Sequence, residues 1–149
     1  MKHRVVITGI GMVTPLGTST QATWQGLMAG RSGTTAMPAS FNLSDFSAKA
    51  VGLVTGEKPL LDLVLPAKFH AKTDRFTHLA LIAGHEAMTD AALTQTMPLE
   101  RDRFGVYMGI GVGGLEGIEQ AVLDRHAGGP KKVSPFTIPK IIKVKSSKQ

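Results

Sequence analysis

The stretch "YMGIGVGGLEGIEQ", residues 107–120, decides the fold because it places a glycine-rich turn between two different hydrophobic patterns. The apolar run before the turn, residues 104–108, predicts a buried strand, and residues 115–126 after it have the spacing of a helix. The turn itself reads G-x-G-x-x-G from Gly109 to Gly114, which in this context is the fingerprint of a dinucleotide-binding site. The first question is therefore whether these glycines bind a nucleotide.

A dinucleotide site also needs an acidic residue about 20 positions further on, which holds a ribose hydroxyl. Ser134 occupies that position here, and Arg31 occupies it after the partial match "TGIGMVT", residues 8–14. We therefore interpret the glycines as positions of tight turning and close backbone approach, with nucleotide binding as the alternative. No cofactor is expected.

Strands and helices alternate along the chain. Residues 4–9, "RVVITG", are β-branched and predict a second buried strand, and residues 50–54 predict a short one. Residues 126–139 are expected to form a loop, and Pro59 and Pro66 are expected to break the segment around them. This order predicts the α/β class with a parallel sheet.

Two further helices are predicted from their caps and apolar spacing. Ser19 or Thr20 is expected to cap a helix that ends near residue 29 and whose apolar face carries Trp24, Leu27 and Met28. Another helix is expected over residues 73–92. Its apolar stripe consists of Phe76, Leu79, Ala80, Ala83, Ala87 and Ala91.

Composition restricts the class of protein. The 149 residues are 42% hydrophobic and 19% charged, which is typical of a globular domain, and they include no cysteine. No apolar run reaches the ~20 residues that span a membrane. The N-terminus reads as a strand rather than a signal peptide, so a cytoplasmic location is expected. Four lysines in residues 140–149 carry much of the net charge of +6, and without a motif or aromatic clusters nucleic-acid binding is not expected.

The polar residues of the predicted helix 73–92 do not indicate a metal site. "HEAMT", residues 85–89, begins like a zinc motif, but Thr89 stands where the second histidine is needed. Asp74, Glu86 and Asp90 are interpreted as the solvated face of this helix.

Four segments, in order, resemble the N-terminal part of a β-ketoacyl-acyl-carrier-protein synthase of the elongating type II kind. They are "RVVITGIGMVTPLG", "TWQGLMAGRSG", "GVYMGIGVGGLEGIEQ" and "GGPKKVSPFTIP". The resemblance covers residues 2 to about 142 and is partly shared by polyketide ketosynthases. It implies the N-terminal part of a thiolase-like, layered α/β/α fold, and a homodimer.

The resemblance also implies roles for five residues. Val112 matches a position in the wall of the acyl-chain pocket, the alternative being plain helix–strand packing. Lysines match the basic residues that meet the acidic acyl carrier protein, the alternative being an ordinary solvated face. These lysines are Lys68, Lys72, Lys131 and Lys132.

In the family that the sequence resembles, catalysis requires a cysteine that takes the acyl group as a thioester. It also requires two histidines and a lysine. None of these matches a residue of this chain, so no catalytic residue is assigned. We expect a truncated domain over residues 1–142 and a basic tail outside the family over 143–149, and a frameshift or another truncation of a longer gene would explain the change. Such a chain is expected to be inactive alone and of marginal stability, and to oligomerise or aggregate. The alternative is a non-catalytic module that binds acyl carrier protein or a full-length ketosynthase subunit.

Overall fold

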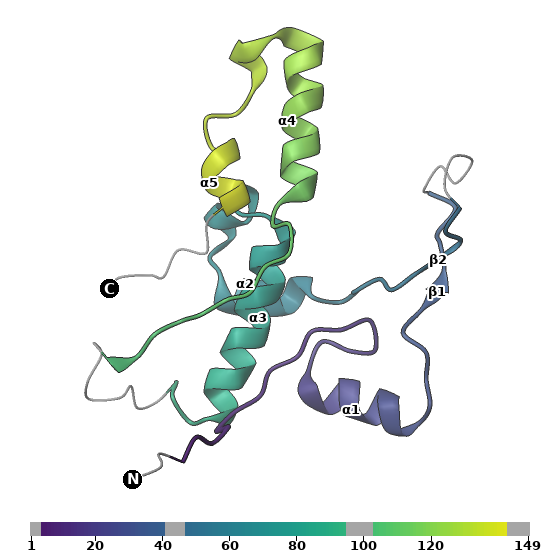
Figure 1. Ribbon diagram of the computed structural model, residues 1–149, viewed down its shortest axis with the longest axis vertical. Helices are drawn as coiled ribbons and strands as arrows, with labels where there is room; N and C mark the ends of the chain where they lie inside the picture. The colour runs from purple at the N-terminus through teal and green to yellow at the C-terminus, as the bar shows by residue number, and fades with distance from the viewer. Residues whose placement is uncertain (1–3, 41–46, 95–102, 143–149) are drawn as a thin grey trace.

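The computed structural model describes residues 4–40, 47–94 and 103–142. In this part of the chain the helices carry most of the regular structure, and the long helix α3 lies at the centre of the molecule (Figure 1). The elements in order are α1 (Thr20–Met28), β1 (Thr35–Ala36), β2 (Ala50–Val51), α2 (Lys58–Val64), η1 (Ala67–Lys72), α3 (Arg75–Asp90), α4 (Leu115–Gly128), η3 (Pro130–Lys132) and α5 (Thr137–Ile142).

Helix α1 begins where the capping signal predicts. The Ser19 hydroxyl accepts a hydrogen bond from the backbone N–H of Ala22, which satisfies one of the free donors of the first turn. The predicted apolar face is wrong, however, since Trp24 is 62% exposed and the buried residues of α1 are Thr23 and Gly26. Small residues are buried because this side of the helix lies directly against the preceding loop.

Helix α3 confirms the predicted helix within two residues at each end. The alanine stripe of α3 packs directly against the N-terminal segment. A Cβ atom on Gly9 would collide with the carbonyl of Ala87, and one on Gly11 with the carbonyl of Ala83. The glycines of "TGIG" thus allow close backbone approach to a helix, as the interpretation without a nucleotide requires.

The carboxylates at the far end of α3 bind backbone groups of other segments, although Asp90 is exposed, as expected for a solvated face. Asp90 accepts a hydrogen bond from the N–H of Ile10 at 2.9 Å. The two oxygens of Glu86 accept from Met12 N–H and from Thr20 N–H, both at 2.8 Å. These acids fix the N-terminal segment and the start of α1 to α3, a role that the sequence interpretation did not include.

The individual strand predictions are mostly wrong in this chain. Residues 4–9 and 104–108 are not in strands, and they lie largely exposed, with Val5 at 94% and Tyr107 at 101% of their free surface. Within the described ranges, the regular sheet is a two-stranded antiparallel pair of β1 and β2, with Thr35 opposite Val51 and Ala36 opposite Ala50. It projects away from the helices (Figure 1), and β2 confirms only the start of the predicted strand 50–54.

Two of the expected irregular segments contain helices. Pro59 lies in the first turn of α2 instead of breaking the segment, because a proline in the first helical turn loses no hydrogen bond. Residues 126–139, expected to be a loop, contain the end of α4, η3 and the start of α5. Helix α5 returns alongside the start of α4, where Gly113 and Gly114 lie against Ile141 (Figure 1).

The core is small. Among the described residues the buried apolar side chains are Leu61 of α2 and Ile82 of α3, which belong to two helices in contact. The accessible surface of the chain is 11950 Å², whereas a compact monomer of this mass exposes roughly 7300 Å². The helices therefore present wide apolar faces to solvent. Among the described residues, no helix has both the length and the apolar character needed to cross a membrane.

Candidate functional site

Two of the four predicted partner-binding lysines share one surface. Lys68 and Lys72 are exposed on η1, and their ammonium groups lie 5.2 and 5.9 Å from the centre of the Phe69 ring. The Lys72 ammonium also lies 5.8 Å from the ring of Phe136, which precedes α5. These distances are within the range of cation–π attraction. Residues far apart in the sequence thus form a basic surface with an aromatic floor, which we call the η1 lysine surface.

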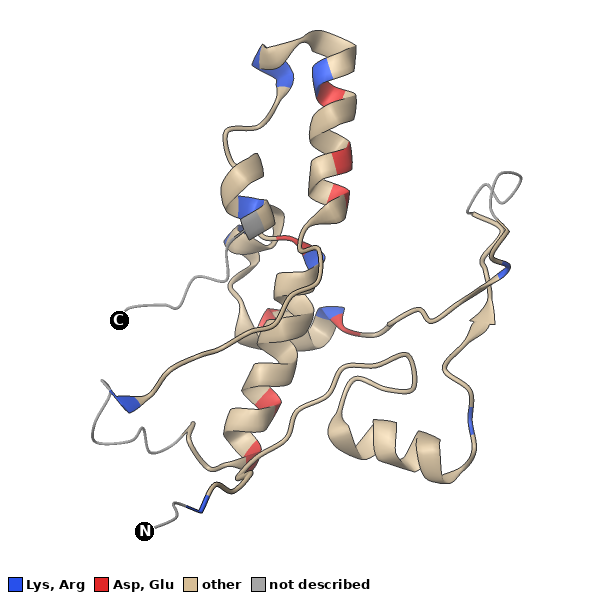
Figure 2. Ribbon diagram, in the orientation of Figure 1, with Lys and Arg blue, Asp and Glu red and all other residues tan. Residues whose placement is uncertain are grey.

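The other two lysines lie elsewhere. Lys131 and Lys132 are exposed in η3, which follows the C-terminal end of α4. The Lys132 side chain packs on Gly128, where a Cβ atom would stand 2.6 Å from its Cδ. Because α4 has 14 residues, η3 lies about 20 Å from the start of that helix. Basic groups accordingly gather at both ends of the α4–α5 arm (Figure 2), in two separate patches.

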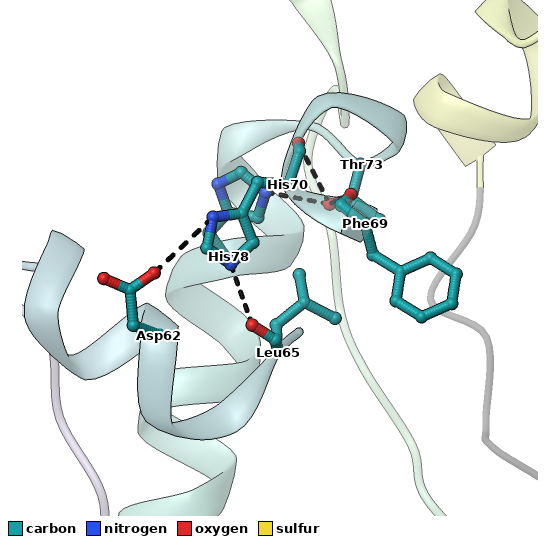
Figure 3. Close-up of polar contacts among 6 residues, drawn as sticks. All are labelled: Asp62, Leu65, Phe69, His70, Thr73 and His78. Carbon is teal, nitrogen blue, oxygen red and sulfur yellow. Dashed lines mark hydrogen bonds and ion pairs between the residues drawn. The ribbon is translucent and has the colours of Figure 1, made fainter. Parts of the chain in front are cut away.

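Two histidines connect η1 with the neighbouring helices. His70 belongs to η1 and His78 to α3, and Figure 3 shows them side by side with their partners. His70 Nε2 donates to the carbonyl of Leu65 at 2.8 Å, and His70 Nδ1 lies 3.7 Å from Asp62 Oδ1 in α2. His78 Nε2 lies 2.8 Å from the hydroxyl of Thr73, and the two imidazole centroids are 6.0 Å apart. The end of α2, η1 and the start of α3 therefore meet at one polar cluster.

Burial lowers the pKa of His78 from its ordinary value, and positive charge on His70 lowers it further. Lys140 acts in the same direction, while the His70 carbonyl and the charge of Asp74 act in the opposite one. The neutral imidazole of His78 is therefore favoured in the folded chain.

Asp74 is a buried N-cap and not part of a solvated face. Its Oδ1 accepts from the N–H of Arg75 at 2.8 Å, and the side chain is only 5% exposed. Its Oδ2 is buried, has no hydrogen-bond partner among the described residues, and faces Gly114 and Gly117 at the start of α4. The hydroxyl of Thr77 is also buried and without a partner there. The glycines make room for this carboxylate beside the N-terminus of α4, where negative charge is favourable.

The glycine turn supplies this room at its second half. Gly113 has a positive φ of 76°, which glycine adopts without strain, whereas Gly109 and Gly111 have open space around them. Val112, the predicted pocket-wall residue, stands on this turn with 69% of its surface exposed. Its assignment to an acyl-chain pocket stays a prediction.

A separate hollow lies between α2, α3 and the residues before α1, and sequence reasoning missed it. Three distant segments form it, so no local pattern could have indicated it. Its lining residues are Thr18, Ser19, Leu60, Leu63, Val64, Ile82, His85 and Glu86. Within the described ranges, no three histidine, aspartate or glutamate side chains come together to hold a metal ion.

The fold defines the class of protein. The chain superposes on a β-ketoacyl synthase from Burkholderia phymatum with a TM-score of 0.73 and 26% identity, covering 95% of this chain and 34% of that one. It also superposes, with a TM-score of 0.61 and 23% identity, on a type II polyketide synthase ketosynthase whose structure contains its acyl-carrier protein, covering 91% of this chain and 35% of that one. The predicted fold class, the N-terminal part of a thiolase-like α/β fold, is thereby confirmed, although most of the predicted strands are not formed.

Residues 2–148 match the family described as "Beta-ketoacyl synthase, N-terminal domain", and the chain belongs to this family. It is 38% identical over 144 residues to 3-oxoacyl-[acyl-carrier-protein] synthase 2 of Vibrio cholerae, a match that covers 95% of this chain and 33% of the relative. The chain therefore spans about a third of the length of the curated relatives that it matches. The predicted resemblance is confirmed.

Proposed function

We propose that this chain is the N-terminal part of a β-ketoacyl-acyl-carrier-protein synthase. Such an acyltransferase joins an acyl thioester to malonyl-acyl carrier protein by decarboxylative Claisen condensation in fatty-acid synthesis, in the cytoplasm. The observation that carries the proposal is the match of residues 2–148 to the N-terminal domain of the family. The division into a domain over residues 1–142 and a basic tail stays a prediction, and the tail lies outside the described residues.

The chain alone is proposed to be inactive, because it has no cysteine to hold the acyl group as a thioester. The test is to incubate the purified 149-residue chain with malonyl-acyl carrier protein and an acyl donor, and to measure released carbon dioxide and condensation product. Neither is expected. Turnover that remains with the chain through successive purification steps would overturn this part of the proposal.

Acyl carrier protein is the proposed partner, and it binds through the lysines. The η1 lysine surface supports this role because exposed ammonium groups beside aromatic rings combine charge with a contact area for an acidic protein. The variant Lys68→Glu with Lys72→Glu should therefore weaken the binding of purified acyl carrier protein at low salt, mainly by slowing association. The variant Lys131→Glu with Lys132→Glu tests the second patch in the same way.

The matched control is Arg31→Glu with Lys58→Glu, which changes the net charge by the same amount at exposed positions outside both patches. Equal loss of binding in the control and in the lysine variants would mean that only net charge matters, and the docking assignment would then be wrong.

Val112 is proposed to form part of the acyl-chain wall. Its exposed, β-branched apolar side chain suits a hydrocarbon chain. If the role is right, the methyl resonances of Val112 should shift when a long-chain acyl thioester is added, while those of the buried Leu61 should not.

A second candidate function is a non-catalytic module that binds acyl carrier protein or a full-length ketosynthase subunit. The excess of exposed apolar surface favours this function, because large exposed apolar surfaces mark sites where another chain binds. The same observation supports self-association. Sedimentation of the chain alone, with acyl carrier protein and with a complete ketosynthase distinguishes these outcomes, and a chain that stays monomeric in all three would contradict both.

A further inference from the structure

The hydroxyl of Thr73 decides which way the hydrogen bond to His78 runs. Thr73 has one hydroxyl hydrogen, and its Oγ1 lies 2.9 Å from the carbonyl of Phe69 and 3.5 Å from the carbonyl of His70, both of which can only accept. With that hydrogen given to Phe69, Oγ1 is left as an acceptor toward His78 Nε2 at 2.8 Å. His78 therefore carries its hydrogen on Nε2, and the bonds run from His78 to Thr73 to Phe69.

This chain of hydrogen bonds connects α3 with the η1 lysine surface. His78 belongs to the first turns of α3, Thr73 ends η1, and Phe69 is the residue whose ring lies under the ammonium groups of Lys68 and Lys72. Holding the Phe69 carbonyl fixes the backbone that carries this ring. We propose that His78 is a positioning residue for the docking of acyl carrier protein, acting through Thr73 to hold η1 and its two lysines in place. This proposal rests on the proposed function.

His70, a residue of η1, bonds this element to the chain that follows α2. Its Nε2 donates to Leu65, so only a ring that also carries a hydrogen on Nδ1 could donate toward Asp62, 3.7 Å away. Positive charge on His70 disfavours a second charge on His78 at a centroid distance of 6.0 Å. The other charged groups acting on His78 are Asp74 and Lys140. The neutral ring of His78 is therefore the donor to Thr73.

The proposal is tested by binding of purified Vibrio cholerae acyl carrier protein to the full 149-residue chain at low salt. His78→Leu and Thr73→Val remove the donor and the hydroxyl at nearly constant size, and each should weaken binding about five-fold, the value of one ordinary hydrogen bond. His78→Gln can still donate from its amide and Thr73→Ser keeps the hydroxyl, so both should bind within about two-fold of the original chain. Thr89→Val is the matched control, because among the described residues the hydroxyl of Thr89 bonds within α3, to the carbonyl of His85 at 2.8 Å.

A second measurement does not depend on the partner or on any variant. Nitrogen chemical shifts of the labelled chain report which imidazole nitrogen carries the hydrogen, and neutral His78 should carry it on Nε2. A hydrogen on Nδ1 overturns the proposal, as does unchanged binding by both His78→Leu and Thr73→Val. Failure of the proposed function is distinct, since the original chain would then not bind the carrier protein or would bind equally well after Lys68→Glu with Lys72→Glu.

Discussion

Replacing Gly117 by alanine should destabilise the chain, although glycine is normally the poorer residue inside a helix. The substitution in α4 gains about 1 kcal/mol from helix propensity. A Cβ atom there would stand 2.8 Å from Asp74 Oδ2 and 3.5 Å from Ile141 Cγ1. Asp74 cannot move away easily, because it is buried and its other oxygen is bonded to Arg75 N–H. Overpacking of this kind costs about 1–3 kcal/mol, so we expect a net loss of about 1 kcal/mol.

Gly84→Ala is the matched control. Gly84 lies inside α3, and a Cβ atom there would have no neighbour within 4 Å, so only the gain of about 1 kcal/mol applies. The two variants should therefore differ by about 2 kcal/mol. In thermal unfolding followed by far-ultraviolet circular dichroism, each 1 kcal/mol corresponds to about 2–4 °C for a chain of this length.

A double-mutant cycle identifies the cause. Asp74→Ser keeps a capping hydroxyl at the start of α3 but removes the oxygen that faces Gly117. In that background Gly117→Ala should stabilise the chain as Gly84→Ala does, giving a coupling of about 2 kcal/mol between positions 74 and 117. Equal shifts for both glycine variants in the original background would refute the packing of Asp74 on α4.

Three further predictions concern local interactions. Because the pKa of His78 is lowered in the folded chain, the unfolded chain binds more protons, and the stability of the fold should fall as the pH drops below about 6.5. In urea titrations at several pH values, His78→Gln should remove this part of the pH dependence. Ser19→Ala should cost about 1 kcal/mol by removing the cap of α1, whereas Ser19→Asp should cost little, as measured by urea unfolding. Glu86→Ala leaves the N–H groups of Met12 and Thr20 without their acceptor, so hydrogen exchange at both should accelerate while exchange at Leu61 should not.

The helices could be predicted from the sequence because their signals are local. Ser19 lies three residues before Ala22, its bonding partner, and the alanine stripe of α3 repeats within a few turns. The strands could not be predicted in the same way, because a strand forms only where another strand supplies hydrogen bonds. Residues 4–9 and 104–108 have the right composition, but in the described structure they have no strand beside them.

The site was predicted only in part for the same reason. The resemblance indicated which lysines to consider as a candidate docking site, whereas the contact of Lys72 with Phe136 joins residues 64 positions apart. Glu86 and Asp90 looked like surface acids because their backbone partners lie 66 to 80 positions away. Asp74 could have been recognised, since an aspartate immediately before an apolar helical pattern is a common N-cap.

The small core has a thermodynamic consequence. Relative to an extended chain of roughly 22900 Å², a compact monomer of this mass buries roughly 15600 Å², whereas an accessible surface of 11950 Å² leaves only about 11000 Å² buried. The heat capacity change of unfolding scales with the surface that becomes hydrated, so it should be about seven-tenths of the usual value. The stability curve of this chain is therefore flatter than that of a well-packed domain of its size, and cooling should weaken the chain less steeply.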